Sequence, residues 1–451
     1  MNKALHTSTI YLIGIGGIGM SALARYFRQQ GKEVSGYDRV STALSRQLES
    51  EGMNIHYDDD PAYVPCDAGL VIYTPAIPES NRQLTYCREF DVPVKKRAEV
   101  LEMIAEDHKT IAIAGTHGKT SISSMVAHIM KSSAFPVNAF IGGIMSNYDS
   151  NMLRDEQSEY LLAEADEYDR SFLRLHPHIA VVSAIAADHL DIYGSHERLR
   201  EAFSAFLSQV NEDGKVIVNE NIATQIALPP NSIIYGTGSK AALRIENVKV
   251  MNHHFQFDFC HDNLRTNIEM RVPGRHNIEN ACAAAGVCLE LGLNDTQIKA
   301  GLESYRGVKR RFEYIINEET LVYVDDYAHH PDEITACTGT AKELYPGRHI
   351  TGIFQPHLYS RTRDFAEGFA ASLETLDEII LLDIYPAREE PIEGVNTRLI
   401  FDKIKNKNKQ LCTKETLAGA LMKGKTEVVI SMGAGDIDQL VEPIKEILLR
   451  K

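Results

Sequence analysis

The chain is best understood from one run of residues: Ile111-Ala112-Ile113-Ala114-Gly115-Thr116-His117-Gly118-Lys119-Thr120-Ser121. The apolar residues predict a buried strand, the glycines a turn, and Lys119-Thr120 the start of a helix. Backbone N–H groups at such a turn point at an anion, so the run predicts a phosphate site. In that site Lys119 would neutralise the outer phosphates, and the Thr120 hydroxyl would ligate magnesium.

The spacing of this run differs from the usual phosphate loop. Two residues separate Gly115 from Gly118, whereas the usual pattern places four between its first glycine and Gly-Lys. The alternative interpretation is a tight strand-to-helix turn with an exposed lysine. The order of strand, glycine, Gly-Lys-Thr and helix favours a shorter variant of the phosphate loop.

The composition is that of a soluble globular protein of about three domains, with 451 residues, 44% apolar and 24% charged. A net charge of -15 argues against a nucleic-acid surface but allows an anionic ligand in a pocket. The seven cysteines form no Cys-x-x-Cys pair and predict a reducing cytoplasm. The uncharged run 9–24 is too short to span a membrane, so we expect no membrane insertion.

A second glycine-rich run follows the apolar segment 9–15, which we expect to form a strand. It reads Gly14-Ile15-Gly16-Gly17-Ile18-Gly19, and a second strand at 33–37 ends on Asp38. This is the dinucleotide fingerprint, although a turn that only packs a helix on a strand remains the alternative. Thr74 follows a further strand at 71–73, at the sheet edge where ligands of such folds bind.

Acidic residues follow the next predicted strands. The strand at 160–163 ends in Glu164-Ala165-Asp166-Glu167, for which a solvated turn is the alternative interpretation. We assign Glu164 as a magnesium ligand because such folds hold the metal at a strand end beside the phosphate loop. The strand at 179–185 leads to Asp188-His189. From 214 to 271, short segments such as 216–218, 232–235 and 255–257 predict an antiparallel patch.

The last third of the chain predicts another α/β domain. Before it, Asn277 and Asn280 share a helix face, where they either cap the helix or offer amides to a purine. Four cations within 306–311 indicate an anion-facing patch or a solvated linker at a domain boundary. Strands beyond it end in polar or glycine residues, so one sheet edge looks like a site. These strand ends are 325–331, 355–363, 383–386 and 431–435.

Taken in order, the motifs resemble those of the Mur ligases, in particular the alanine-adding branch. The motifs are Gly-Thr-His-Gly-Lys-Thr (115–120), Glu-Ala-Asp-Glu (164–167), Ala-Asp-His-Leu-Asp (187–191), Gly-Arg-His-Asn-x-x-Asn (274–280), Lys-Arg-Arg-Phe-Glu (309–313), Asp-Asp-Tyr-Ala-His-His-Pro (325–331) and Gln-Pro-His (355–357). The resemblance implies three α/β domains. These are an N-terminal Rossmann-like domain for a UDP-sugar (1–106), a central P-loop ATPase with a mixed sheet (107–310) and a C-terminal Rossmann-like domain that closes over the site (311–451).

The resemblance also implies a reaction. ATP would phosphorylate the lactyl carboxylate of UDP-N-acetylmuramate, and L-alanine would attack the acyl phosphate, in cytoplasmic peptidoglycan precursor synthesis by a monomer or homodimer. Catalysis would rest on Lys119, Glu164, His189, Arg311 and His329. Magnesium, or manganese in its place, would be held by Thr120, Glu164 and His189.

Binding residues follow from the same resemblance. ATP would contact Gly115, Thr116, His117, Gly118, Lys119, Thr120, Ser121, Asn277, Asn280, Arg311 and Asp326. The UDP-sugar would contact Gly14, Gly16, Gly17, Gly19, Asp38 and Thr74, which replaces the nicotinamide interpretation of the fingerprint. The amino acid would contact Tyr327, His329, His357 and Arg361.

Several positions depart from the family pattern. Leu358 stands where many alanine-adding relatives carry arginine, Ser121 replaces a threonine, and Ala184 and Ala186 replace polar residues. No lysine lies between Asp188 and Lys215, so we expect no carbamylated lysine. The alternatives are a ligase that attaches a recycled murein peptide to the same sugar nucleotide, an NAD-dependent oxidoreductase and a non-catalytic nucleotide-binding protein.

Overall fold

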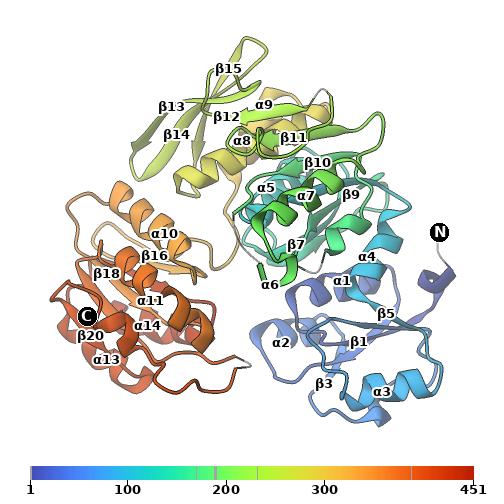
Figure 1. Cartoon of the computed structure of the whole chain (residues 1–451), viewed down its shortest axis with the longest axis horizontal. Coiled ribbons are helices and arrows are strands. Elements are labelled where there is room, and N and C mark those ends of the chain that lie inside the picture. Colours follow the sequence, from blue (N-terminus) through green and yellow to red (C-terminus); the bar gives the residue numbers. More distant parts are fainter. Residues whose placement is uncertain (1–2, 169, 187–189, 231, 388) are drawn as a thin grey trace. The chain divides into compact units, whose positions relative to one another are not determined.

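The structure, a computed structural model, describes residues 3–168, 170–186, 190–230, 232–387 and 389–451. Strands of these residues form three sheets, as expected for the α/β fold class (Figure 1). The chain divides into two compact units. The first consists of Met1–Asn247, Phe257–Ile268 and Glu279–Arg306, and the second of Val248–Gln256, Glu269–Ile278 and Gly307–Lys451.

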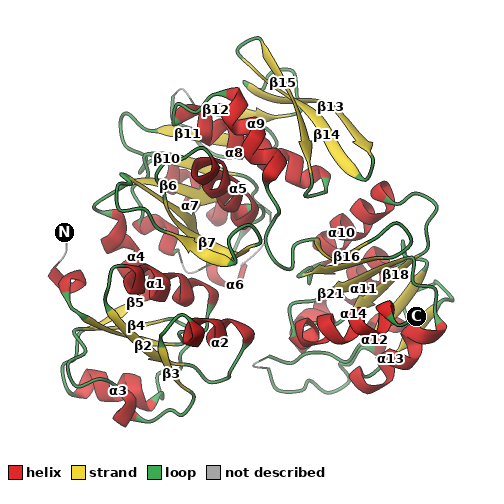
Figure 2. Cartoon of the chain, turned by 180° about the vertical axis from the view of Figure 1, so that it is seen from behind, coloured by secondary structure: helices red, strands yellow, loops and turns green. Residues whose placement is uncertain are grey.

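The N-terminal sheet is a parallel Rossmann-like sheet with strand order β3-β2-β1-β4-β5. Its strands are β1 (Thr9–Ile13), β2 (Glu33–Tyr37), β3 (Asn54–His56), β4 (Leu70–Tyr73) and β5 (Val94–Lys96). Helices α1 (Ile18–Gln29) and α2 (Ala43–Ser50) lie on one side and α3 (Arg82–Glu89) on the other (Figure 2). Helix α4 (Arg97–Ala105) leads to the central sheet, and the short η1 (Lys3–His6) and η2 (Pro61–Tyr63) complete this part.

The central sheet has ten strands in the order β15-β14-β13-β12-β11-β10-β6-β9-β7-β8. They are β6 (Lys109–Ala114), β7 (Asn138–Met145), β8 (Ser150–Leu153), β9 (Tyr160–Ala165), β10 (Ile179–Val182), β11 (Lys215–Asn219), β12 (Ile233–Gly236), β13 (Leu243–Met251), β14 (His254–His261) and β15 (Leu264–Met270). The accompanying helices are α5 (Lys119–Ser132), η3 (Ser171–Arg174), α6 (Leu190–Tyr193), α7 (His196–Leu207), α8 (Arg275–Glu290) and α9 (Asp295–Ser304). Parallel and antiparallel pairs coexist, which confirms the predicted mixed sheet.

The predicted antiparallel patch is wrong for its first two segments. Strand β11 pairs parallel with β10, and β12 pairs parallel with β11. Their apolar residues run without alternation, as in strands buried on both faces of a parallel sheet. Only β13, β14 and β15 are joined by two-residue turns with positive φ, 252–253 and 262–263, the geometry of antiparallel hairpins.

The C-terminal sheet has the order β16-β17-β21-β18-β19-β20, with only β16 antiparallel to its neighbour. Its strands are β16 (Glu313–Asn317), β17 (Val322–Asp326), β18 (Ile350–Phe354), β19 (Glu378–Leu381), β20 (Lys409–Leu411) and β21 (Val428–Met432). Its helices are α10 (Pro331–Leu344), α11 (Tyr359–Leu373), α12 (Arg398–Phe401), α13 (Lys414–Lys423), η4 (Asp436–Leu440) and α14 (Val441–Leu449). All strands except β16 end at one edge, as the sequence predicts.

The N-terminal and central sheets share one hydrophobic core, which contains residues of both. Helix α1 packs against β7 and β8. The buried Arg25 on α1 forms an ion pair with Glu51 and donates a hydrogen bond to Asn151 on β8 (2.5 Å). Asn151 in turn donates to the Ile18 carbonyl (2.6 Å). These contacts fix the first turn of α1 relative to the central sheet.

A buried histidine makes the stability of the first unit depend on pH. His128 on α5 lies 2.8 Å from the Tyr148 hydroxyl and 3.0 Å from the Ser304 hydroxyl. Burial, assisted by the Arg306 charge, lowers its pKa from 6.5 to about 4. Between these values the unfolded chain binds more protons than the folded one, so stability falls as pH falls.

We expect the free energy of unfolding to lose about 2 kcal/mol from this group between pH 6.5 and pH 4.5. His128→Gln keeps a donor and an acceptor but removes the titrating group. Urea unfolding of both proteins at several pH values should show a smaller loss in the variant. Equal losses would contradict this role of His128.

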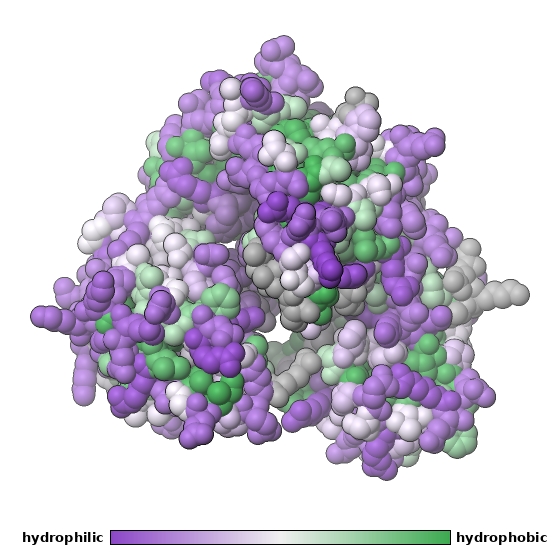
Figure 3. Space-filling model, viewed as in Figure 1, coloured by the Kyte–Doolittle hydropathy of each residue, from purple (hydrophilic) through white to green (hydrophobic). Residues whose placement is uncertain are grey.

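No helix among the described residues is long and apolar enough to cross a membrane. On the face shown in Figure 3, hydrophilic side chains predominate and hydrophobic ones form small groups.

Candidate active site

The predicted phosphate loop joins β6 to α5, as expected. Gly115 has a φ of 129° and Gly118 a φ of 85°, values that favour glycine. A Cβ atom at Gly118 would also lie 2.6 Å from the Asn280 carboxamide oxygen, and one at Gly115 would collide with the Ser183 hydroxyl. The loop backbone therefore requires both glycines.

Backbone groups that follow β10 hold the middle of the loop. The Thr116 N–H donates to the Ala184 carbonyl (2.9 Å), and the Thr116 hydroxyl accepts a hydrogen bond from the Ala186 N–H (2.9 Å). The Ser183 hydroxyl donates to the His117 carbonyl. Since the backbone of Ala184 and Ala186 makes these contacts, the loop is supported although both side chains are apolar.

Lys119 is held by a buried carboxylate. Its Nζ donates to Glu167 at 2.8 and 2.9 Å and to the Gly115 carbonyl at 2.8 Å. Glu167 is fully buried, and burial raises the pKa of its carboxyl group while the Lys119 charge opposes that rise. Glu167 is not among the residues with a predicted role. The sequence feature that could have indicated its role is its position in the acidic run 164–167 at the end of β9.

Glu164 lies beside the start of α5. It is the fifth residue of β9, because the strand runs two residues further than expected. Its Oε1 accepts hydrogen bonds from the Gly142 N–H (2.6 Å) and the Ser123 hydroxyl (3.1 Å), and its Oε2 accepts one from the Thr120 hydroxyl (3.1 Å). The structure thus brings the predicted metal ligands Thr120 and Glu164 together.

These oxygen atoms fit a magnesium ion. Mg²⁺ commonly takes one or two carboxylates and fills its remaining positions with water and substrate phosphates. The described residues contain no group of three or more His, Cys, Asp or Glu side chains that could hold a metal. The third predicted ligand, His189, lies outside the described residues.

In the glycine turn after β1, a backbone N–H group donates a hydrogen bond to the Asp38 carboxylate. The strand ends at Ile13 rather than at residue 15, and Gly14 has a φ of 87°. Asp38 accepts a hydrogen bond from the Gly16 N–H (2.8 Å), and a Cβ atom at Gly14 would lie 3.2 Å from the Thr74 methyl carbon. The turn, Asp38 and Thr74 therefore lie together, as predicted.

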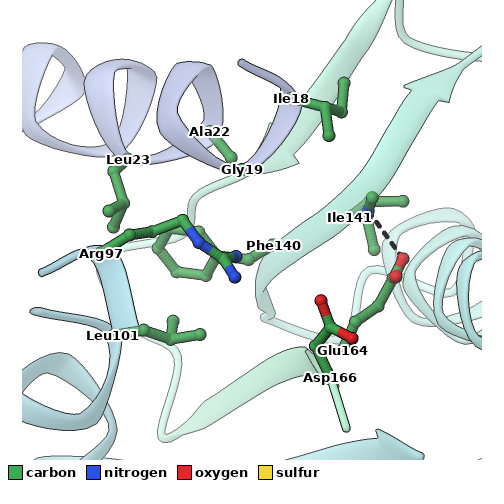
Figure 4. A pocket seen from close by; sticks show the side chains of 11 residues that line it. Ile18, Gly19, Ala22, Leu23, Arg97, Leu101, Phe140, Ile141, Glu164 and Asp166 are labelled. Carbon is green, nitrogen blue, oxygen red and sulfur yellow. Dashed lines mark hydrogen bonds between the residues drawn. The ribbon is translucent and has the colours of Figure 1, made fainter. Parts of the chain in front are cut away.

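A cavity of about 250 Å³ lies between this turn and Glu164 (Figure 4). Its walls come from α1, α4, β7 and the end of β9. It is lined by Ile18, Gly19, Ala22, Leu23, Arg97, Leu101, Phe140, Ile141, Gly142, Glu164 and Asp166. Arg97 is the first residue of α4 and belongs to none of the motifs singled out in the sequence.

The two asparagines of α8 do not cap it. The helix begins at Arg275, so Asn277 and Asn280 lie within its first turns, and both are buried. The Asn277 amide donates to the Pro273 carbonyl (2.6 Å). The Asn280 carboxamide lies against Gly118 of the phosphate loop.

In the second unit, the four predicted amino-acid-binding residues gather at the carboxyl ends of β17 and β18. The rings of His329 and His357 lie 6.1 Å apart, and the Tyr327 ring lies 5.1 Å from His329. An Arg361 nitrogen is 3.4 Å from His357 Nδ1. Burial lowers the pKa of His329, and burial and the Arg361 charge lower that of His357 to about 4. Both rings are therefore neutral at pH 7.

Two further features surround this cluster. Tyr385 stacks on His357 with ring centroids 5.9 Å apart, and its carbonyl accepts a hydrogen bond from the Leu358 N–H (2.9 Å). Leu358 has a φ of 71°, which is strained for a leucine. The position that departs from the family pattern is therefore also a strained one.

Asp326, at the end of β17, accepts hydrogen bonds from the N–H groups of Phe312 and Ala328, each at 2.7 Å. Burial raises its pKa to about 6. Of the predicted basic patch, Arg310 forms an ion pair with the buried Asp325 (2.9 Å), whereas Arg311 is exposed. The patch thus contains one residue, Arg310, whose ion pair stabilises the fold, and one exposed cation, Arg311.

The chain is similar to known proteins along most of its length. Residues 9–109 match the Mur ligase family catalytic domain, 113–288 the Mur ligase middle domain and 310–435 the Mur ligase glutamate ligase domain. The UDP-N-acetylmuramate–L-alanine ligase of Parabacteroides distasonis is 46% identical over 98% of each chain. That of Cytophaga hutchinsonii is 47% identical over 98% of this chain and 97% of its own.

Solved structures share the fold. The structure of a UDP-N-acetylmuramate-alanine ligase from Thermotoga maritima has a TM-score of 0.85 at 28% identity, and the match covers 98% of this chain and 100% of that one. A murein peptide ligase from Psychrobacter arcticus has a TM-score of 0.70 at 21% identity over 98% of each chain. The latter likeness concerns the fold alone.

Proposed function

Because the chain belongs to the Mur ligase family, we propose that it is an ATP-dependent ligase that joins L-alanine to the lactyl carboxylate of UDP-N-acetylmuramate. The observation that carries this proposal is identity of 46% and 47% along almost the whole chain to ligases of that name. The reaction belongs to peptidoglycan precursor synthesis, and we place it in the cytoplasm, with the protein a monomer or homodimer.

The chemistry proceeds in two transfers. A carboxylate is a poor electrophile, so an oxygen of the lactyl carboxylate first attacks the γ-phosphorus of ATP and releases ADP. The amine of alanine then attacks the acyl phosphate, and the tetrahedral intermediate collapses with loss of phosphate to leave an amide. The protein's tasks are to position the reactants and to stabilise the negative charge of the transferred phosphoryl group.

The first unit supplies the phosphate site. Lys119 leaves Glu167 to bind the outer phosphates, and the N–H groups of His117 to Ser121 bind the remaining phosphate oxygens. Thr120 and Glu164, with His189, would hold magnesium, which when bound neutralises phosphate charge. The glycine turn with Asp38 and Thr74 binds the UDP diphosphate. Asn277 and Asn280 are the candidates for contact with adenine.

The second unit supplies the alanine site. Arg361 binds the carboxylate of alanine. Position 358, where many relatives carry an arginine, is a leucine in this chain, so Arg361 supplies the positive charge of the cluster. His329 is neutral at pH 7 and accepts the proton that the alanine ammonium must lose before attack. Tyr327 and His357 shape the pocket. We assign Asp326 to the ribose of ATP and Arg311 to its phosphates.

The three domains of the proposal are 1–106, 107–310 and 311–451. Two observations support these bounds. The family matches end at 109 and 288 and resume at 113 and 310, and the second compact unit takes over the chain at Gly307.

The test is phosphate release from ATP with magnesium and UDP-N-acetylmuramate, with L-alanine in one tube and a cell-wall tripeptide in another. We expect release that depends on alanine. Release with tripeptide alone would identify a recycling ligase, and release in neither tube would favour a binding protein. An oxidoreductase would instead bind a nicotinamide cofactor at the Gly14–Gly19 turn.

A further inference from the structure

We propose that Arg97 binds the carboxylate of the acid substrate and presents it to the phosphoryl donor. The inference rests on the proposed function and assigns a residue that neither the motifs nor the phosphate loop includes. It starts from the cavity of Figure 4, in which the Arg97 guanidinium points across the space toward the side where Glu164 and Asp166 lie.

The backbone of Arg97 is fixed. It is the first residue of α4, which is capped by a hydrogen bond from the Lys96 N–H to the Glu99 carboxylate (2.7 Å). From there the side chain crosses the first turn of α1 at Gly19. A Cβ atom at Gly19 would lie 2.7 Å from Arg97 Nη1 and 3.1 Å from its Cδ. Glycine at this position therefore leaves the room that the guanidinium occupies.

The Arg97 guanidinium forms no ion pair within the described part of the chain. Among the described residues none pairs with its guanidinium or accepts a hydrogen bond from it, although the group is only partly exposed. Two other arginines of this unit are paired, Arg25 with Glu51 and Arg174 with Glu102. An unpaired, partly buried guanidinium in a cavity is suited to bind a ligand carboxylate by two parallel hydrogen bonds.

The wall of the cavity opposite Arg97 is acidic, so an anionic substrate needs a cation in this cavity. Glu164 and Asp166 both line the cavity, and Glu164 also contacts Thr120 at the start of the phosphate-loop helix. A substrate carboxylate must approach this acidic wall to reach the phosphoryl group of ATP. Arg97 offsets the repulsion and leaves one carboxylate oxygen free to attack.

The diphosphate of the sugar nucleotide is the other anion that Arg97 could bind. Its assigned site is the glycine turn, which precedes the N-terminus of α1. The cavity instead follows one side of α1, formed by Ile18, Gly19, Ala22 and Leu23, toward β7 and the end of β9. Arg97 lies on that side, so the geometry favours the carboxylate.

The test compares two ligands that differ in the lactyl group. UDP-N-acetylmuramate carries the carboxylate, and UDP-N-acetylglucosamine has the same nucleotide and sugar without it. Isothermal titration calorimetry on the full chain would measure both affinities for wild type, Arg97→Gln and Arg97→Lys. Arg82→Gln, which removes an exposed charge from the same sheet domain, is the matched control.

We expect Arg97→Gln to weaken binding of UDP-N-acetylmuramate by roughly 10- to 100-fold and to change binding of UDP-N-acetylglucosamine by less than about 2-fold. Arg97→Lys should lie between wild type and Arg97→Gln, because lysine keeps the charge but not the two-pronged geometry. Thermal unfolding verifies that each variant folds.

Equal weakening of both ligands would assign Arg97 to the diphosphate and overturn the proposal, as would unchanged affinities. Failure of the proposed function has a different signature. In that case wild type itself would not bind UDP-N-acetylmuramate, or would bind it without alanine-dependent release of phosphate.

Discussion

Lys119→Ala is expected to lower alanine-dependent phosphate release by roughly 10³-fold, because the variant loses the cation that faces the phosphate loop. Lys119 Nζ lies 2.8 Å from the Gly115 carbonyl, within the loop itself. Initial rates at saturating ATP, sugar nucleotide and alanine measure the effect. Lys131→Ala, at the exposed end of the same helix α5, is the control and should retain the wild-type rate.

The same substitution has a second, separable consequence. It leaves Glu167 fully buried without its partner, which costs about 3 kcal/mol of stability or forces the carboxyl group to bind a proton. The double variant Lys119→Ala/Glu167→Gln removes that charge. We expect it to recover stability in urea unfolding while phosphate release stays low.

This pair of variants separates catalysis from folding. If the double variant recovered activity together with stability, Lys119 would act only as the partner of Glu167. Unchanged ATP consumption in the single variant would equally contradict its assignment to the outer phosphates.

Glu164→Gln is expected to lower kcat by roughly 10²- to 10³-fold and to raise the magnesium concentration needed for half-maximal rate. Glutamine has the same shape, and its oxygen still accepts the hydrogen bond from the Gly142 N–H, so the fold should persist. The variant lacks the negative charge that attracts the ion. Rates measured over a magnesium titration, after removal of divalent ions with a chelator, test both effects.

Glu159→Gln provides the control. Glu159 immediately precedes the same strand, β9, and forms an exposed ion pair with Lys109, a type of contact that contributes little. Its variant should keep the wild-type rate and magnesium dependence. A Glu164→Gln enzyme with a lower rate but unaltered magnesium dependence would show that Glu164 positions the loop rather than the metal.

Local signals in the sequence were sufficient to predict the strand, turn and helix of the proposed phosphate site. Strand β6, the two glycines and the start of α5 lie within 24 residues of each other, from Lys109 to Ser132. The alternation of apolar runs and glycine turns likewise predicted the Rossmann-like fold of the first sheet. Chain-local sterics and burial decide such features, so no knowledge of distant contacts is needed.

Pairing over long sequence distances was harder to predict. The segments at 216–218 and 232–235 were expected to pair antiparallel but are parallel, since short apolar runs do not reveal the direction of their neighbours. For Asn277 and Asn280 of α8, the sequence did not distinguish helix capping from ligand binding. The two alternatives differ by a shift of about two residues in the start of the helix, which sequence patterns do not fix.

The sequence by itself determined the fold class, the turn of the predicted phosphate loop and the glycine turn, since neighbouring residues define each of them. The cluster of Tyr327, His329, His357 and Arg361 followed from the resemblance to the Mur ligases. Only the tertiary structure decided that Lys119 pairs with Glu167, 48 positions away, and that Arg97 reaches across Gly19 into a cavity with Glu164. The physical reason is that such contacts depend on the packing of separate elements, whose relative placement arises from burial of a shared core and leaves no local pattern in the chain.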